Sequence, residues 1–309
     1  MSKSPLKIAF FGMPGSGFSA RLFRDMVGMA HADPVNLQIA QLVVPLRPEA
    51  LSDPRIPLSK VTGGLLETAR QEGIAIAGFP DPGDTAFTAM WDTEAPDLLI
   101  VGCFPFKIPS AILQMASLGG WNLHPSLLPA YRGADPLFWQ LRDGLDETAI
   151  TLHQLTEQLD AGDILGQSRH SVVAGIGAGQ LSLQLAQLGS SLLDETIQAL
   201  LTDQLSATPQ RPGGASYQPP PQARDFFLDD SWTAERAWRF IKGTQEYGKH
   251  FLLQSSIGEV MFKDVAGYQK GKTVNESHIT SDQLHIQMSD GTLSIPLGAV
   301  LNMEGLKLT

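Results

Sequence analysis

Three polar residues, an amide, an imidazole and a carboxylate, stand where they could serve one reaction. Asn122 and His124 lie two residues apart in the segment 121–125, and Asp160 follows in the segment 159–163. Residues two apart on an extended strand point to the same face, so Asn122 and His124 are expected side by side. An amide N–H stabilises an oxyanion, an imidazole moves a proton and a carboxylate orients the imidazole. The set therefore predicts acyl-transfer chemistry.

The turn that follows His124 is expected to be rigid. Pro125 restricts His124 to extended geometry, and Pro129 interrupts the next segment, so residues 126–133 cannot form an ordinary helix. Taken alone, the three residues are also compatible with His124 being a buried or capped histidine without a catalytic role, because motifs of this length occur by chance. His153, which alternates with apolar neighbours, is expected to face either the active-site cleft or solvent.

The first two hundred residues alternate between apolar strands and helix-like segments. Residues 6–12, 37–44 and 98–101 are predicted strands, and residues 182–201 carry apolar side chains at helical spacing. Such alternation predicts a Rossmann-like, mostly parallel α/β sheet joined by right-handed crossovers. Ligands of these sheets bind at the carboxyl ends of the strands, where Asn122 and His124 are expected.

A second, smaller domain is predicted near the C-terminus. Residues 204–223 are rich in proline and glycine and read as a linker. Beyond them, one helix over 233–243 precedes short strands, with a hairpin turn at Asp290-Gly291. We therefore expect a catalytic domain over residues 1–203 and a small, mainly β, OB-like barrel domain over residues 224–309.

Composition limits the functional classes that are possible. The 309 residues carry a formal net charge of −10, and Cys103 is the single cysteine. One cysteine and no leader-like or membrane-spanning apolar run favour a cytoplasmic protein without a membrane partner. The acidic balance argues against binding nucleic acid through a broad basic surface. Histidines are scattered singly, so no metal is predicted, and Cys103 is expected to be a small buried side chain.

The motif string as a whole indicates one family. Residues 122–133 (Asn-Leu-His-Pro-Ser-Leu-Leu-Pro-Ala-Tyr-Arg-Gly), followed by residues 160–165 (Asp-Ala-Gly-Asp-Ile-Leu), resemble the folate-dependent formyltransferase family. The tail is similar to the C-terminal domain of its methionyl-tRNA formyltransferase-like members, and other parts are similar to sugar-amine N-formyltransferases. The resemblance implies a one-carbon group transferase that moves a formyl group from 10-formyltetrahydrofolate to a primary amine.

The resemblance also implies roles for individual residues. Asn122, His124 and Asp160 match the catalytic trio, in which Asn122 and a protonated His124 stabilise the oxyanion and Asp160 positions His124 and takes part in proton removal. A carboxylate partner raises the pKa of a histidine, which favours the protonated form. An apolar slot suits the flat pterin of the co-substrate. The residues implied for that slot are Phe106, Lys107, Ile108, Pro109, Ser126, Leu127, Leu128, Pro129, Gln158 and Leu159; the alternative for Phe106 is plain core packing.

The acceptor amine is left open between initiator methionyl-tRNA and a small-molecule amine such as an aminosugar nucleotide. The tRNA enzyme of the family carries a basic loop after the second strand and a basic C-terminal domain. Here residues 45–60 hold three cations and two carboxylates, and residues 224–309 hold nine cations and eleven carboxylates. Counterion release from phosphates needs clustered cations, so this departure weakens the tRNA interpretation.

Two other functions stay as alternatives. A 10-formyltetrahydrofolate hydrolase would use water in place of the amine, but Asn122 argues against it because the hydrolase-type domain retains only the His and Asp. A binding module without catalysis would not need all three polar residues. The oligomeric state is not predicted.

Overall fold

In the computed structural model the chain divides into two compact units. The first unit comprises residues 1–133, 149–170 and 182–217, and the second comprises residues 134–148, 171–181 and 218–309. The second unit thus takes in two segments that precede residue 203, and the predicted division at residues 203 and 223 stays a prediction. The structure describes residues 4–32, 36–45, 64–79, 95–255, 257–271 and 277–303, so most of the loop at 45–60 lies outside the described residues.

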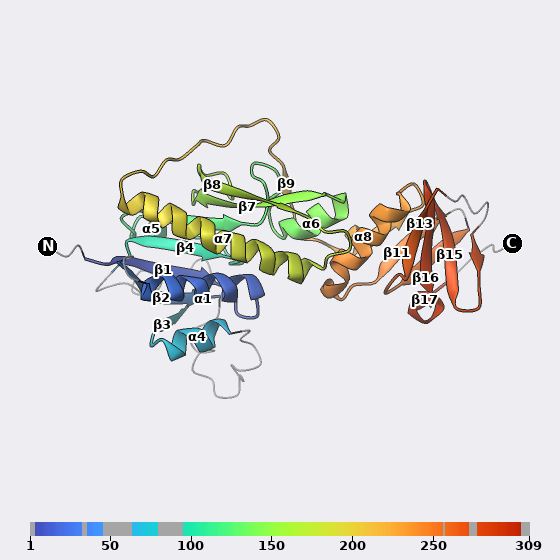
Figure 1. Ribbon diagram of the computed structural model, residues 1–309, viewed down its shortest axis with the longest axis horizontal. Helices are drawn as coiled ribbons and strands as arrows, with labels where there is room; N and C mark the ends of the chain where they lie inside the picture. The colour runs from blue at the N-terminus through green and yellow to red at the C-terminus, as the bar shows by residue number, and fades with distance from the viewer. Residues whose placement is uncertain are drawn as a thin grey trace. The chain divides into compact units, whose positions relative to one another are not determined.

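The first unit is built on a seven-stranded sheet (Figure 1) with the strand order β3-β2-β1-β4-β5-β7-β8. The pairs among β1 to β5 are parallel, and β7 runs antiparallel to β5. The prediction of a mostly parallel α/β sheet is therefore confirmed. The strands span β1 Leu6–Gly12, β2 Leu37–Val44, β3 Ala75–Gly78, β4 Leu98–Gly102, β5 Gly120–His124, β7 Glu147–Gln154 and β8 Ile164–Ser171.

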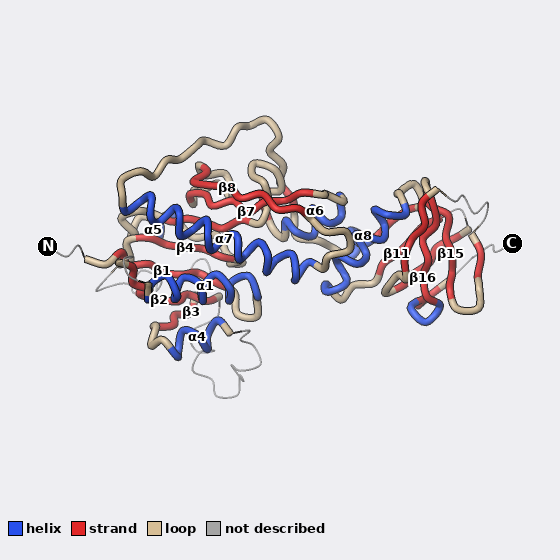
Figure 2. The backbone as a smooth tube through the Cα atoms, viewed as in Figure 1, coloured by secondary structure: helices blue, strands red, loops and turns tan. Residues whose placement is uncertain are grey.

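Helices α1 and α7 cover one face of this sheet (Figure 2). Gly189 of α7 lies directly against Leu123 of β5 and Leu22 of α1, which leaves no room for a larger side chain in α7. Because side chains alternate along β5, Asn122 and His124 point to the opposite face. The helices are α1 Gly17–His31, α4 Leu65–Gln71, α5 Ser110–Leu113 and α7 Ala178–Leu201.

The opposite face carries an apolar and aromatic cluster beside the predicted site. Phe104 and Phe106 are half-buried there, and the Phe106 ring stacks on Phe79 with centroids 5.8 Å apart. Val101 belongs to the same cluster and pairs with Asn122 in the register of β4 and β5. The cluster therefore lies next to Asn122 on one face of the sheet.

The second unit is β-rich, as predicted. Its strands form two four-stranded sheets, β10-β11-β12-β17 and β13-β16-β15-β14. They span β10 Phe227–Asp229, β11 Phe251–Ser255, β12 Gly258–Phe262, β13 Gly267–Lys270, β14 His278–Ile279, β15 Gln283–Met288, β16 Gly291–Pro296 and β17 Val300–Asn302. Its helices are α6 Pro136–Asp143 and α8 Ala234–Thr244. Thr233 caps α8, since its hydroxyl accepts from the Arg236 N–H at 3.2 Å.

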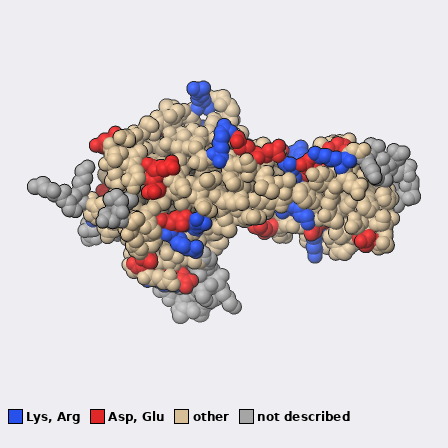
Figure 3. Space-filling model, viewed as in Figure 1, with Lys and Arg blue, Asp and Glu red and all other residues tan. Residues whose placement is uncertain are grey.

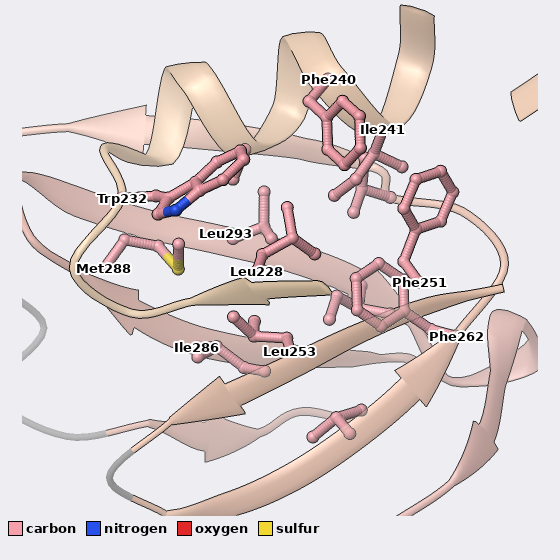
Figure 4. Packing of buried hydrophobic residues seen from close by; sticks show 14 of the residues in the cluster. Leu228, Trp232, Phe240, Ile241, Phe251, Leu253, Phe262, Ile286, Met288 and Leu293 are labelled. Carbon is pink, nitrogen blue, oxygen red and sulfur yellow. The ribbon is translucent and has the colours of Figure 1, made fainter. Parts of the chain in front are cut away.

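An aromatic core holds this unit together (Figure 4). Phe240 of α8 packs on Phe251 of β11 with ring centroids 5.7 Å apart, and Phe138 of α6 lies 5.8 Å from Phe240. Residues 134–148 therefore join the C-terminal strands through buried aromatic contacts. Such pairs stabilise a core by somewhat more than their buried area alone.

Two features of the surface bear on the sequence predictions. Cys103 is exposed and has a φ of 60°, so the prediction that it is buried was wrong. It directly follows β4, where the chain turns away from the sheet. On the face drawn in Figure 3, Lys and Arg are interspersed with Asp and Glu. Of the helices that the structure describes, none is long and apolar enough to cross a bilayer.

The aromatic core gives a direct stability prediction. Phe240→Ala removes a fully buried ring and should destabilise the protein by about 3–5 kcal/mol. Phe227→Ala is the matched control, because the Phe227 ring is 48% exposed and its loss should cost less than about 1 kcal/mol. Urea unfolding followed by tryptophan fluorescence measures both. Equal losses in the two variants would contradict this description of the core.

Candidate active site

The pairing of β5 with β7 places four polar side chains together. Asn122 stands opposite His153, and His124 stands opposite Thr151. Each pair shares the face of the sheet that lies away from α1 and α7. His124 and His153 are buried, and Asn122 is half-buried.

The Asp160 carboxylate completes the cluster from the loop that follows β7. Its Oδ1 accepts from the Asn122 Nδ2 at 3.3 Å, and its Oδ2 lies 3.7 Å from the His124 Nδ1. The Gly133 N–H donates to Oδ2 at 2.8 Å. Asp160 itself is buried and has a φ of 51°. The structure therefore brings Asn122, His124 and Asp160 together, although Asp160 is distant from the other two in sequence.

His153 belongs to the same cluster, a placement that the sequence left open. Its Nε2 lies 3.1 Å from the Asn122 Nδ2 and 3.5 Å from the Asp160 Oδ1. Its Nδ1 lies 2.8 Å from the Gln154 carbonyl, which can only accept, so Nδ1 carries the proton. The Nε2 of His153 thus faces both the Asn122 amide, which donates to the Asp160 Oδ1, and the Asp160 carboxylate itself. Alternation with apolar neighbours was the available signal, but it could not show which strand β7 would pair with.

The protonation state of His124 follows from its two neighbours. Its Nε2 lies 2.8 Å from the Tyr131 carbonyl and must be the protonated nitrogen, which turns the Nδ1 lone pair toward Asp160. Burial lowers the pKa of His124 below its ordinary value and outweighs the attraction of Asp160, which raises it. The expectation of a protonated His124 was therefore wrong for the free protein at neutral pH, because desolvation exceeds the effect of the carboxylate.

Asp160 keeps its charge in spite of being buried. Burial by itself raises the pKa of this carboxyl, but the imidazoles of His124 and His153 and the Gly133 N–H together lower it to about 2. A carboxylate that accepts several hydrogen bonds is commonly stabilised in this way. The site thus holds a buried carboxylate that is surrounded by two imidazoles and a backbone N–H.

The turn after β5 is held by hydrogen bonds to β7 and β8. The Thr151 hydroxyl donates to the Ser126 carbonyl at 2.7 Å, and the Gln167 amide donates to the Leu128 carbonyl at 2.9 Å. The Leu128-Pro129 peptide bond is cis. These contacts fix the residues that lead from His124 to Gly133, the donor to Asp160.

The residues predicted to bind the co-substrate fall in three segments around this cluster. Phe106–Pro109 follows β4, Ser126–Pro129 is the turn after β5, and Gln158 with Leu159 directly precedes Asp160. Ser110, next to the first segment, donates to Glu157, next to the third, at 2.8 Å. Leu159 is 43% exposed and Phe106 is half-buried, so apolar surface is accessible in two of the segments. Whether they bind a pterin stays a prediction.

A mostly parallel α/β sheet with an amide, an imidazole and a carboxylate near the carboxyl end of a central strand is an arrangement that suits one class of chemistry, acyl transfer. Comparison with known proteins specifies the class further. Residues 79–197 match the family model described as formyl transferase. Methionyl-tRNA formyltransferase of Ehrlichia ruminantium (strain Welgevonden) is 32% identical over 214 residues, which are 69% of this chain and 68% of that protein. The chain belongs to the formyltransferase family.

Other relatives match over different lengths. Methionyl-tRNA formyltransferase of Desulfotalea psychrophila is 36% identical over 176 residues, which are 57% of this chain and 54% of that protein. The two Synechococcus enzymes of the same name are matched over 45% of their length, so the chain spans about half the length of these relatives. The Nitratidesulfovibrio vulgaris enzyme is 31% identical, with 85% of this chain and 75% of that protein covered.

Solved structures share the fold. The N-formyltransferase of Helicobacter canadensis, determined with folinic acid and dTDP-3-aminofucose, superposes with a TM-score of 0.67 at 14% identity, covering 96% of this chain and all of that chain. HypX of Aquifex aeolicus in complex with tetrahydrofolic acid gives a TM-score of 0.56 at 16% identity, over 93% of this chain and 43% of that one. At these identities the similarity establishes the fold and no more.

Gly162 is the tightest point of the loop that carries Asp160. A Cβ atom there would lie 1.9 Å from the Gln154 carbonyl oxygen of β7, a backbone atom that cannot rotate away. Gly162→Ala should therefore lower the free energy of unfolding by about 1–3 kcal/mol. Gly213→Ala is the control, because nothing lies within 4 Å of its Cβ position. Chemical denaturation of both measures the difference, and an unchanged Gly162→Ala variant would contradict the close packing of this loop.

The depressed pKa of Asp160 predicts a stability change in acid. A carboxyl whose folded pKa is about 2, against an ordinary 3.8, stabilises the folded state above pH 4 and loses that contribution as the pH falls toward 2. The free-energy advantage of the wild type over Asp160→Asn should therefore decrease by about 1–2 kcal/mol between pH 5 and pH 2.5. Urea unfolding of both proteins across this range provides the measurement. Parallel curves would show that Asp160 is not a stabilised carboxylate.

Proposed function

We propose that the protein transfers a formyl group from 10-formyltetrahydrofolate to a primary amine. The observation that carries the proposal is the buried cluster of Asn122, His124 and Asp160 at the carboxyl end of β5. Membership of the formyltransferase family agrees with it. Relatives of the same fold were determined with folinic acid and with tetrahydrofolic acid, which supports a folate as the formyl donor.

The residues around the cluster fit a folate. Half-buried Phe106 offers an aromatic surface, and the Ser110–Glu157 hydrogen bond ties its segment to the exposed Leu159. Flat heteroaromatic ligands bind in slots of this kind, with backbone groups supplying hydrogen bonds. The residues that would hold the donor are those of segments 106–109, 126–129 and 158–159. The donor supplies an activated formyl group when it is bound.

The chemistry of the chain's own residues follows from their proton states. Asn122 has amide hydrogens that can be redirected from His153 and Asp160 to the negative charge that develops on the formyl oxygen. His124 is neutral, with its Nδ1 lone pair toward a carboxylate. The proton released by the attacking amine would be held by the His124–Asp160 pair, because an imidazolium formed next to Asp160 gains a direct charge partner.

For the acceptor we propose the amine of initiator methionyl-tRNA, since four relatives at 31–38% identity are methionyl-tRNA formyltransferases. An aminosugar nucleotide is the second candidate. It is favoured by the Helicobacter canadensis structure, whose fold covers 96% of this chain and whose ligand is an aminosugar nucleotide, and by the acidic balance of residues 224–309. The cytoplasmic location stays a prediction.

An acceptor screen tests this choice. Wild-type protein with 10-formyltetrahydrofolate should release tetrahydrofolate in the presence of methionyl-tRNA, at a rate that falls steeply as salt rises, since phosphate contacts are screened. A dTDP-aminosugar and a reaction without amine are run in parallel. Activity only with the aminosugar would select the second candidate. Turnover without amine would indicate a hydrolase, and no turnover in any reaction would overturn the proposal.

Substitution of the amide tests the assigned catalytic role. Asn122→Ala should lower kcat by about 10²- to 10³-fold, because one oxyanion donor is lost while substrate binding is largely kept. Asn302→Ala removes an exposed amide in β17 and should leave kcat unchanged. Steady-state kinetics with the acceptor selected above compares the two. Wild-type kcat in Asn122→Ala would remove Asn122 from the mechanism.

A further inference from the structure

The proline-rich segment after α7 is hydrogen-bonded at several residues to the elements around Asp160. Figure 1 shows residues 202–216 leading from the end of α7 to β9 (Tyr217–Gln218). Thr208 exchanges two backbone hydrogen bonds of 2.8 Å with Ile164 at the start of β8. The Ser216 carbonyl accepts from the Arg132 N–H at 3.0 Å, and its hydroxyl accepts from the Tyr131 N–H at 2.8 Å. The segment thus connects the loop of Asp160 with the turn after β5.

Gln210 lies between these two attachment points and joins them with its side chain. Its Nε2 donates to the Asp160 carbonyl at 2.8 Å and to the Gly162 carbonyl at 2.7 Å. Its Oε1 accepts from Arg132 through Nε at 3.1 Å and Nη2 at 2.7 Å. An amide has two N–H donors and one oxygen with two lone pairs, so Gln210 uses its full hydrogen-bonding capacity. A flipped amide would set donor against donor and acceptor against acceptor, which fixes its orientation.

The two groups that Gln210 joins are the two that determine the position of the Asp160 carboxylate. One is the backbone of Asp160, which is held in the left-handed region at a φ of 51°. The other is Arg132, whose next residue, Gly133, donates its N–H to the carboxylate. A change in either would alter the 3.7 Å separation between Asp160 Oδ2 and His124 Nδ1. A displacement of a reacting group by about 1 Å can lower a reaction rate by a large factor.

We propose that Gln210 is a positioning residue that holds the Asp160 loop and β6 (Arg132–Gly133) together, and so sets the place of the Asp160 carboxylate beside His124 and Asn122. The inference rests on the proposed function for its effect on rate, but its effect on geometry is independent of the reaction. It also gives the segment predicted to be a linker a direct part in the site.

Two substitutions at Gln210 test the proposal. Gln210→Ala removes all four hydrogen bonds, and Gln210→Glu keeps an oxygen for Arg132 while replacing the two donors with an oxygen that faces two carbonyls. Both should lower kcat by about 10- to 100-fold with little change in the KM of either substrate. Gln204→Ala, an exposed glutamine of the same segment, should match the wild type. Circular dichroism melts establish that the proteins compared are folded. If Gln210→Ala does not fold, the comparison is made with Gln210→Glu.

A titration of His124 provides a readout that a merely structural role would not change. Its imidazole resonances, assigned by comparison with His124→Gln, should titrate at a lower pH in Gln210→Ala than in the wild type. The charge of Asp160 raises the pKa of His124, and this effect should weaken when the carboxylate lies farther away in the variant. If the wild type transfers no formyl group, the proposed function fails but this shift still supports the positioning role. Folded Gln210 variants with wild-type kcat and an unshifted His124 titration would overturn it.

Discussion

The burial of one carboxylate is the constraint on which the rest of the site depends. Asp160 lies in the protein interior, yet its pKa is lowered to about 2 because neighbouring groups compensate for the water it has lost. An unpaired buried charge would destabilise the folded state, so the elements around Asp160 supply groups that stabilise its negative charge. The β5–β7 pairing brings the amide and the imidazoles, and the turn after β5 brings the Gly133 N–H.

The sheet supplies rigidity where this charge has to be held. The face of β5 toward α1 and α7 is closely packed, as the contacts of Gly189 show, while the other face presents Asn122 and His124 next to the Phe104–Phe106 cluster. Site residues placed on paired strands are located more accurately than residues on free loops. Asp160 does come from a loop, but Gly162 packs that loop against β7 and Gln210 joins it to Arg132.

The sequence predicted the elements and the trio, but not the contacts that connect them. Period-two alternation fixed Asn122 and His124 on one face, and the motif string over residues 122–133 and 160–165 indicated the family. The place of His153 depends on β7 pairing with β5, and the role of Gln210 depends on the path of a proline-rich segment; neither leaves a periodic signal. The protonation of His124 was predicted wrongly, because the sequence shows its charge partner but not the degree of its burial. Likewise, the general tendency of free cysteines to be buried suggested that Cys103 is buried, whereas the turn after β4 exposes it.

A crystal structure of the protein with folinic acid would show whether the buried cluster around Asp160 is where a formyl group is transferred. We expect the pterin to contact segments 106–109, 126–129 and 158–159, with the reactive end of the folate within about 4 Å of the Asn122 amide or the His124 imidazole. A folate bound away from Asn122 and His124, with the cluster unchanged and out of its reach, would show that formyl transfer does not take place at this cluster.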